Sequence, residues 1–288
     1  MMPARTRPQL LETIESVRSA TAAARDAGRP VALVPTMGAL HDGHLAHVER
    51  TRELDAFTIV SIFVNPLQFG AGEDFDRYPR TLDADLDALA VAGADAVFAP
   101  AVGEMYPDGG ARVTVSAGPV GTTFEGRARP GHFDGALTVV AKLFNIVRPD
   151  LATFGRKDAQ QLFLVERMVR DLDMPVRIEP IETVREPDGL ARSSRNRYLS
   201  PADRRAALVL PRALEAAQSS ADRGIDAVLA AAQSVFSGEE HVDVDYFAVV
   251  DPATFTPVPD EFRGHALAIV AARVGATRLI DNASIRLA

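Results

Sequence analysis

Short apolar runs alternate with amphipathic segments along the first part of this chain. The apolar runs are rich in β-branched residues and predict buried strands at residues 31–35, 58–64, 96–99, 151–154 and 176–181. Between them, apolar residues recur every three or four positions, which predicts helices over about residues 10–28, 44–54, 82–93, 135–147 and 159–171. Strands that alternate with helices of this length indicate an α/β fold, a Rossmann-like doubly wound parallel sheet with helices on both faces.

The pattern changes beyond about residue 183. Ser200 followed by Pro201 is typical of the start of a helix, and two Ala-rich helices separated by Gly224 come next. Strand patterns then cover residues 242–248, 265–274 and 277–281. We therefore expect two domains, a Rossmann-like domain over residues 1–183 and a smaller C-terminal α+β domain over residues 184–288.

The composition narrows the range of possible partners. The 288 residues include no cysteine, which excludes disulfides, thiolate metal sites and cysteine nucleophiles. The net charge is −8 and no long Lys/Arg block is present, so we expect no nucleic-acid partner. The first residues lack a signal-peptide pattern, and no apolar run approaches the roughly 20 residues of a membrane span. We therefore expect a cytoplasmic protein with no membrane partner.

The strongest chemical signal follows the predicted strand at residues 31–35. A turn and then a His-x-Gly-His pattern, from His41 to His44, precede the next helix. The first N–H groups of a helix lack partners within it and attract anions, and Gly43 lets a ligand approach the backbone. We predict a phosphate site made of free backbone N–H groups and two imidazoles. A zinc pair and ordinary histidines are the alternatives, and for His47 we favour a structural role.

Two further segments carry clustered polar groups. Residues 155–161 follow the strand at 151–154, and ligands gather at such strand ends. There Lys157 offers a mobile positive charge to a phosphate, and Asp158 offers an acceptor to ribose hydroxyls. Residues 192–197 form the densest cluster of cations in the acidic chain and suit oxyanions. A capped turn with solvated charges and a solvated basic loop are the alternatives.

Amides and carboxylates mark two other places. Asn65 and Gln68 follow the strand at residues 58–64 and are able to orient a hydroxyl or a carboxylate. The predicted helix that follows carries three aspartates, which we expect on its solvent-exposed face: Asp83, Asp85 and Asp87.

Taken together, these segments resemble the pantothenate synthetase family, whose members join pantoate to β-alanine with ATP. The resemblance covers nearly the whole chain and rests on motifs at residues 35–44, 63–69, 78–80, 125–126, 129–133, 155–158 and 193–196. It implies an ATP-dependent ligase that forms a pantoyl adenylate and releases AMP and pyrophosphate, with Mg²⁺ carried by the nucleotide. It also implies a homodimer, an N-terminal domain that binds ATP and pantoate, and a C-terminal domain that acts as a lid.

The resemblance assigns roles to individual residues. It implies catalytic roles for His44, the family's proton donor, and for His41, Lys157, Ser193, Ser194 and Arg195. It implies an ATP site made of Met37, Gly38, Ala39, Leu40, His41, Asp42, Gly43, His44, Gly155, Arg156, Lys157, Asp158, Val184, Arg192, Ser193, Ser194 and Arg195. It places pantoate on Gln68 and Gln161, with Gln68 also near β-alanine and Asn65 as a further substrate-binding residue. No residue is assigned to a metal ion.

The chain departs from the family pattern at two of these positions. The family often has an acidic residue where Arg156 stands and an apolar residue where Arg192 stands. If both positions contribute backbone contacts, the ATP site is unchanged; if their side chains contribute, the nucleotide contacts assigned there differ. Another adenylate-forming nucleotidyltransferase and a non-catalytic ATP-binding regulator are the alternative functions.

Overall fold

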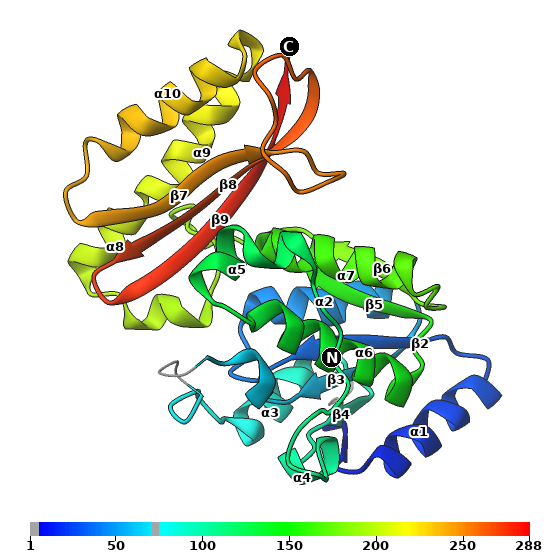
Figure 1. The fold of residues 1–288 in the computed structure, drawn as a ribbon. Coiled ribbons are helices and arrows are strands. Elements are labelled where there is room, and N and C mark those ends of the chain that lie inside the picture. The colour runs from blue at the N-terminus through cyan, green and yellow to red at the C-terminus, as the bar shows by residue number, and fades with distance from the viewer. Residues whose placement is uncertain (1–5, 71–74) are drawn as a thin grey trace. The chain divides into compact units, whose positions relative to one another are not determined.

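The computed structural model describes residues 6–70 and 75–288. Contacts within the chain divide it into two compact units (Figure 1). Unit 1 consists of Met1–Arg156 and Leu164–Glu182, and unit 2 consists of Lys157–Phe163 and Thr183–Ala288. The functional domains expected over residues 1–183 and 184–288 stay a prediction, and residues 157–163 group with the C-terminal part.

Unit 1 is built on a six-stranded parallel sheet with the order β1-β4-β3-β2-β5-β6. Its strands are β1 (Gln9–Leu11), β2 (Val31–Thr36), β3 (Phe57–Ile62), β4 (Ala96–Phe98), β5 (Leu151–Gly155) and β6 (Arg177–Ile181). The apolar runs form the inner strands because both faces of such a sheet are covered. The predicted doubly wound parallel sheet is therefore confirmed.

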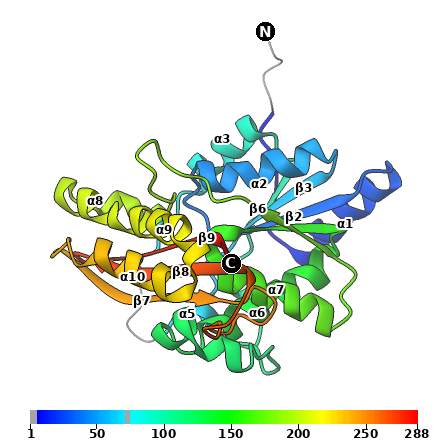
Figure 2. The ribbon, with the colours of Figure 1, turned by 90° about the horizontal axis from the view of Figure 1, so that it is seen from above.

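Helices cover both faces of this sheet. The helices of this part of the chain are α1 (Ile14–Asp26), α2 (Asp42–Glu53), α3 (Leu82–Ala92), α4 (Val102–Met105), α5 (Phe124–Ala128), α6 (His132–Val147) and α7 (Ala159–Asp171), and α7 begins in residues grouped with unit 2. Helices α2 and α3 pack their apolar residues onto Val34, Val60 and Val97 of the central strands. Figure 2 shows α6 on the other side of the strands, where Phe144 contacts Phe154 of β5.

The beginning of the chain differs from the prediction. Leu10 and Leu11, expected in the first helix, lie in β1 and pair with β4. Helix α1 begins only after Thr13, whose side chain accepts a hydrogen bond from the Ser16 N–H. A strand of three residues is too short to show a period of its own, so its pairing with a distant strand decides its conformation. Thr13 is the local signal for the true helix start.

Unit 2 joins an antiparallel sheet to three helices. The strands are β7 (Val242–Val250), β8 (Gly264–Val274) and β9 (Thr277–Leu287), in that spatial order. The helices are α8 (Pro201–Ala207), α9 (Val209–Ser219) and α10 (Ile225–Phe236), and α9 and α10 pack against the sheet (Figure 1). The predicted cap at Ser200 is confirmed, because its hydroxyl accepts from the Asp203 N–H. Strand β9 is longer than expected since Ile285 and Leu287 continue its buried side.

None of the helices in residues 6–70 and 75–288 combines the length and the apolar character needed to span a bilayer.

Candidate functional site

β2 is the strand at which the spatial order of the sheet changes direction. The chain passes from β2 to β3 and β4 on one side and later places β5 on the other side of β2. In open parallel sheets, ligands bind beyond the carboxyl ends of the strands at such a switch point. The carboxyl end of β2 leads directly into residues 36–44, and that of β5 leads into Gly155 and Arg156. Two of the predicted segments thus follow neighbouring strands.

His41 and His44 lie against each other at the start of α2. His41 is the N-cap residue, and the two ring centroids are 4.0 Å apart. The Gly43 N–H donates to Nδ1 of His41 at 3.1 Å, and the His41 N–H donates to Nδ1 of His44 at 3.3 Å. This is the reciprocal arrangement of a capping box, with imidazoles in place of the usual hydroxyl and carboxylate.

These two hydrogen bonds fix the tautomer of both rings. A backbone N–H only donates, so each Nδ1 is the unprotonated acceptor of a neutral imidazole. The ring proton therefore lies on Nε2 in His41 and in His44. The start of α2 carries a pair of imidazole N–H donors, a chemistry that suits phosphate oxygens.

The backbone N–H groups that precede α2 are engaged within the protein. The N–H groups of Ala39 and Leu40 donate to the carboxylate of Asp85 at 3.0 and 2.8 Å, and that of Gly38 donates to the Thr36 hydroxyl at 3.3 Å. At the helix start itself, the Gly43 N–H donates to Nδ1 of His41 and the His44 N–H donates to the His41 carbonyl at 2.7 Å. The prediction of free backbone N–H groups at the start of this helix is therefore wrong for Gly43 and His44.

The prediction that all three aspartates of α3 face solvent is wrong for Asp85. Asp85 is only 3 % exposed, whereas the side chains of Asp83 and Asp87 are 93 % and 64 % exposed. Asp85 lies three residues after Leu82 and four before Leu89, so it shares their buried face. Its hydrogen bonds to backbone N–H groups offset the cost of burying the carboxylate.

His47 connects α2 to β5. Its Nδ1 lies 2.9 Å from the hydroxyl of Thr153, and a Cβ placed on Gly155 would lie 3.6 Å from its Nε2. This contact fits the structural role that we predicted for His47.

Asn65 and Gln68 form the centre of a buried amide network. They are 1 % and 9 % exposed. The Asn65 amide donates to Oε1 of Gln68 at 3.3 Å and to the Gly135 carbonyl at 3.1 Å, and it accepts from the Tyr106 hydroxyl at 2.8 Å. The Gln68 amide donates to the thioether of Met37 at 3.0 Å. A thioether is a weak acceptor, so an oxygen of a bound substrate would be a better partner for Gln68.

The Tyr106 hydroxyl serves this network as a donor. Burial raises the pKa of Tyr106 to about 12, so the hydroxyl keeps its proton at neutral pH. The ammonium of Lys142 lies 5.5 Å from the centre of its ring. Tyr106 therefore fixes Oδ1 of Asn65 and is not a base under ordinary conditions.

Arg129 and His132, to which no role was assigned from the sequence, support the backbone of Gln68. Nδ1 of His132 lies 2.9 Å from the Gln68 carbonyl, and Nε2 lies 3.0 Å from the Arg129 guanidinium. A carbonyl only accepts and a guanidinium only donates, so the ring proton of His132 lies on Nδ1. The motif at residues 129–133 was visible in the sequence, but its contact with Gln68 was not.

Unit 2 carries the other predicted site residues, namely Lys157, Asp158, Gln161, Val184, Arg192, Ser193, Ser194 and Arg195. The Lys157 carbonyl accepts from Nδ2 of Asn282 on β9 at 2.9 Å. The Arg192 N–H donates to the Val184 carbonyl at 2.9 Å, and the Ser193 hydroxyl accepts from the Arg195 N–H at 3.2 Å. A single ATP site built from these residues and the histidine pair stays a prediction.

Ion pairs hold the loop that carries Val184 and Arg192. Glu186 accepts from Asn196 at 2.7 Å and from Arg204 at 2.6 Å, and Arg204 also donates to Asp188 at 2.7 Å. Burial favours the protonated form of each carboxyl, but the hydrogen bonds outweigh it and lower the pKa of Glu186 and of Asp188 below their ordinary values of 4.5 and 3.8.

We expect this network to make the stability of unit 2 sensitive to acid. Because the folded-state pKa values are lowered, the contribution is complete above pH 4.5 and is lost as the pH falls through the folded values. Arg204→Gln should therefore lower the free energy of unfolding at pH 6.5, and its difference from the wild type should shrink at pH 3. Urea unfolding at both values measures this, with the neighbouring Arg205→Gln as the control. An equal difference at both pH values would contradict the prediction.

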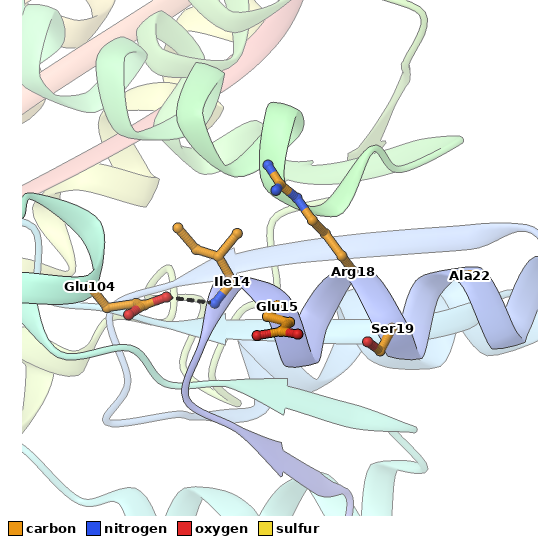
Figure 3. A pocket seen from close by; sticks show the side chains of 6 residues that line it. All are labelled: Ile14, Glu15, Arg18, Ser19, Ala22 and Glu104. Atoms are coloured by element: carbon orange, nitrogen blue, oxygen red, sulfur yellow. Dashed lines mark hydrogen bonds between the residues drawn. The ribbon is translucent and has the colours of Figure 1, made fainter.

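A shallow groove on unit 1 lies along α1 and carries none of the predicted site residues. Ile14, Glu15, Arg18, Ser19, Ala22 and Glu104 line it (Figure 3). The Glu104 carboxylate accepts from the Ile14 N–H at 2.8 Å and so satisfies the first residue of α1. This contact places a carboxylate at the start of α1, on one side of the groove.

The comparisons with known proteins address the chain as a whole. A family model described as Pantoate-beta-alanine ligase matches residues 9–284. The chain belongs to the pantoate-beta-alanine ligase family. The resemblance read from the motifs is therefore confirmed.

Relatives and solved structures of this family cover nearly the full chain. The pantothenate synthetase of Leifsonia xyli subsp. xyli is 55 % identical to this chain, over 97 % of this chain and 97 % of its own length. That of Acidothermus cellulolyticus is 56 % identical, over 98 % of this chain and 93 % of its own length. The crystal structure of pantothenate synthetase from Thermus thermophilus has a TM-score of 0.88 and 48 % identity, over 96 % of this chain and 98 % of that one. The crystal structure of the pantoate-beta-alanine ligase from Francisella tularensis, complexed with β-γ ATP and β-alanine, has a TM-score of 0.77 and 30 % identity. The match covers 96 % of this chain and 97 % of that one.

Proposed function

We propose that this chain joins pantoate to β-alanine at the expense of ATP, with the histidine pair of α2 among the groups that bind the phosphates. Membership of the pantoate-beta-alanine ligase family over residues 9–284 is the observation that carries the reaction. The reaction is that of the family: it forms a pantoyl adenylate and releases AMP and pyrophosphate. The roles of individual residues are our assignment.

In the first step, a carboxylate oxygen of pantoate attacks the α-phosphorus of ATP, the α–β phosphoanhydride bond breaks and pyrophosphate leaves. Pantoate is already ionised at neutral pH because carboxyl groups titrate near ~4, so this step needs no base. The difficulty is the approach of an anion to a polyanion. The Nε2–H groups of His41 and His44 would donate hydrogen bonds to the phosphates, and the cations of Lys157 and Arg195 would neutralise charge as pyrophosphate departs.

In the second step, the amine of β-alanine attacks the acyl carbon and the bond to AMP breaks. The ammonium group of β-alanine must first lose a proton. Tyr106 does not accept it near neutral pH, since its pKa is raised to about 12. We assign Gln68 and Gln161 to the binding of pantoate, with Asn65 as a further substrate-binding residue that also donates to Gln68. The weak acceptor that Gln68 uses in the structure, the Met37 thioether, supports this assignment.

The remaining ATP contacts are assigned to four stretches of the chain, which lie at strand ends and in loops. They are Met37 to His44, Gly155 to Asp158, Val184, and Arg192 to Arg195. The Arg156 side chain pairs with Glu182 at 2.8 Å, which supports a backbone contact at this departure from the family pattern.

We further propose that Mg²⁺ arrives with the nucleotide, that the enzyme is a homodimer and that it acts in the cytoplasm. When bound, Mg²⁺ would neutralise charge on the phosphates. In the part of the chain that the structure describes, no group of three His, Cys, Asp or Glu side chains is placed to hold a metal ion. The side chains that we assign to the phosphates are imidazoles and cations, which fits a metal carried by phosphate oxygens.

The experiment that tests this function is ATP–pyrophosphate exchange with the purified protein. Labelled pyrophosphate should enter ATP only when pantoate is present, and no β-alanine should be needed. Exchange that requires another carboxylate would favour a different adenylate-forming enzyme. ATP binding without exchange for any carboxylate would favour the regulator.

A further inference from the structure

Asp85 is a buried carboxylate whose hydrogen bonds are directed at the loop that enters α2. Its two oxygens accept from the N–H groups of Ala39 and Leu40 at 3.0 and 2.8 Å, and one also accepts from the Thr81 hydroxyl at 3.1 Å. The residue is 3 % exposed. A carboxylate is rarely buried so deeply unless its hydrogen bonds hold it there, so these contacts make the position of the loop and that of the carboxylate depend on each other.

The loop that Asp85 holds has an unfavourable backbone conformation. Gly38 and Ala39 have φ of 84° and 52°, in the left-handed region, and a side chain on Ala39 makes that region costly. A Cβ on Gly38 would lie 3.2 Å from Oδ2 of Asp85 and 3.0 Å from Ile62, so the loop backbone lies close to the carboxylate. The hydrogen bonds of Asp85 offset the strain that the loop would otherwise release.

The loop in turn determines where the two imidazoles lie. His41 follows Leu40 directly, and its own N–H donates to Nδ1 of His44. A shift of the Ala39 and Leu40 amides therefore moves His41, which follows them in the chain. It also moves the His44 ring, because the His41 N–H holds that ring at Nδ1. We propose that Asp85 is a positioning residue, which holds this loop so that both Nε2–H donors face the phosphates of ATP. The catalytic part of the inference rests on the proposed function.

Asp85→Asn tests the inference with little change in volume. An asparagine keeps one acceptor oxygen and replaces the other with an NH₂ group, which opposes a backbone N–H instead of binding it. Asp83→Asn on the same helix is the matched control, because that side chain is 93 % exposed. Thr81→Val is a milder second variant, which removes one hydrogen bond from the carboxylate and keeps its charge.

Two measurements are made on each variant. Single-turnover formation of pantoyl adenylate at saturating substrates should slow by about a hundredfold in Asp85→Asn, the effect expected when reacting groups are misplaced by about 1 Å. It should slow less in Thr81→Val and remain unchanged in Asp83→Asn. Long-range ¹H–¹⁵N spectra of the imidazoles, recorded without ATP, should show His41 and His44 as Nε2–H tautomers in the wild type and a mixture in Asp85→Asn. His132, held as the other tautomer, should not change.

The outcomes separate this inference from the proposed function. An altered tautomer spectrum in Asp85→Asn supports the positioning role even if the wild type shows no pantoate-dependent exchange, which would reject the function alone. Unchanged imidazole signals together with an unchanged adenylation rate per folded molecule would overturn the role of Asp85. If Asp85→Asn does not fold, Thr81→Val decides: a slower adenylation step at wild-type thermal stability supports the role, and a wild-type rate rejects it.

Discussion

Replacement of His44 with alanine is expected to slow adenylate formation by about a hundredfold or more, the usual scale for the loss of one such donor. The ring of His44 has two separable functions. Its Nδ1 accepts from the His41 N–H, and its Nε2–H is the donor that we assign to the phosphates. Alanine removes both, and rapid-quench assays of a single turnover measure the loss.

Two amide variants separate these functions of His44. The oxygen of asparagine reaches the place of Nδ1 but leaves the donor position empty, whereas the NH₂ group of glutamine reaches the place of Nε2. We therefore expect His44→Gln to retain more activity than His44→Asn. His265→Ala, at an exposed position of β8, is the control and should leave the rate unchanged. Equal rates for the glutamine and asparagine variants would argue against the Nε2–H donor.

Gly135→Ala is expected to impair both stability and the use of pantoate. A Cβ on Gly135 would lie 2.1 Å from the Leu67 carbonyl oxygen and 2.7 Å from the Gln68 amide nitrogen. Backbone atoms cannot rotate away as a side chain does, so either α6 or the turn at Pro66–Gln68 must shift. We expect a loss of about 1–3 kcal/mol in the free energy of unfolding, as for other overpacked sites.

The same substitution should raise the pantoate concentration that half-saturates exchange, because the displaced turn carries Gln68. The matched control is Gly103→Ala on α4, where a Cβ meets no atom within 4 Å. In a helix, that change should leave the stability equal or slightly higher. Urea unfolding and pantoate titration of the exchange reaction check both variants. A Gly135→Ala protein with normal stability and normal pantoate dependence would show that the contact is less tight than the structure indicates.

The helices and strands with a clear apolar pattern could be predicted from the sequence, because each carries its own local signal. The apolar runs of β2, β3 and β5 reflect burial along most of each strand, and the period of α6 and α7 reflects burial of one face of each helix. β1 could not be predicted in this way, since its three residues are defined by pairing with β4. Ser200 and Pro201 gave the start of α8 because a cap acts through neighbours in the chain.

The candidate site shows the same division between local and distant contacts. The spacing of His41 and His44 is that of a capping box, so their mutual contact was in principle present in the sequence, hidden by the unusual residue types. The spacing of Asp85 from Leu82 and Leu89 in the sequence is that of residues on one face of a helix. This spacing would have placed Asp85 on the buried face. No local pattern connects it with Ala39, or His132 with Gln68, because those partners are brought together only by the packing of separate elements.

The two imidazoles at the start of α2 are locked by main-chain amides before any nucleotide arrives. Neither ring turns over without giving up a hydrogen bond at Nδ1, so most of their rotational freedom has been removed during folding. At the phosphate site that we propose, ATP would then have little side-chain entropy left to remove, and more of the contact energy would be expressed as affinity. The imidazole pair is in this respect preorganised.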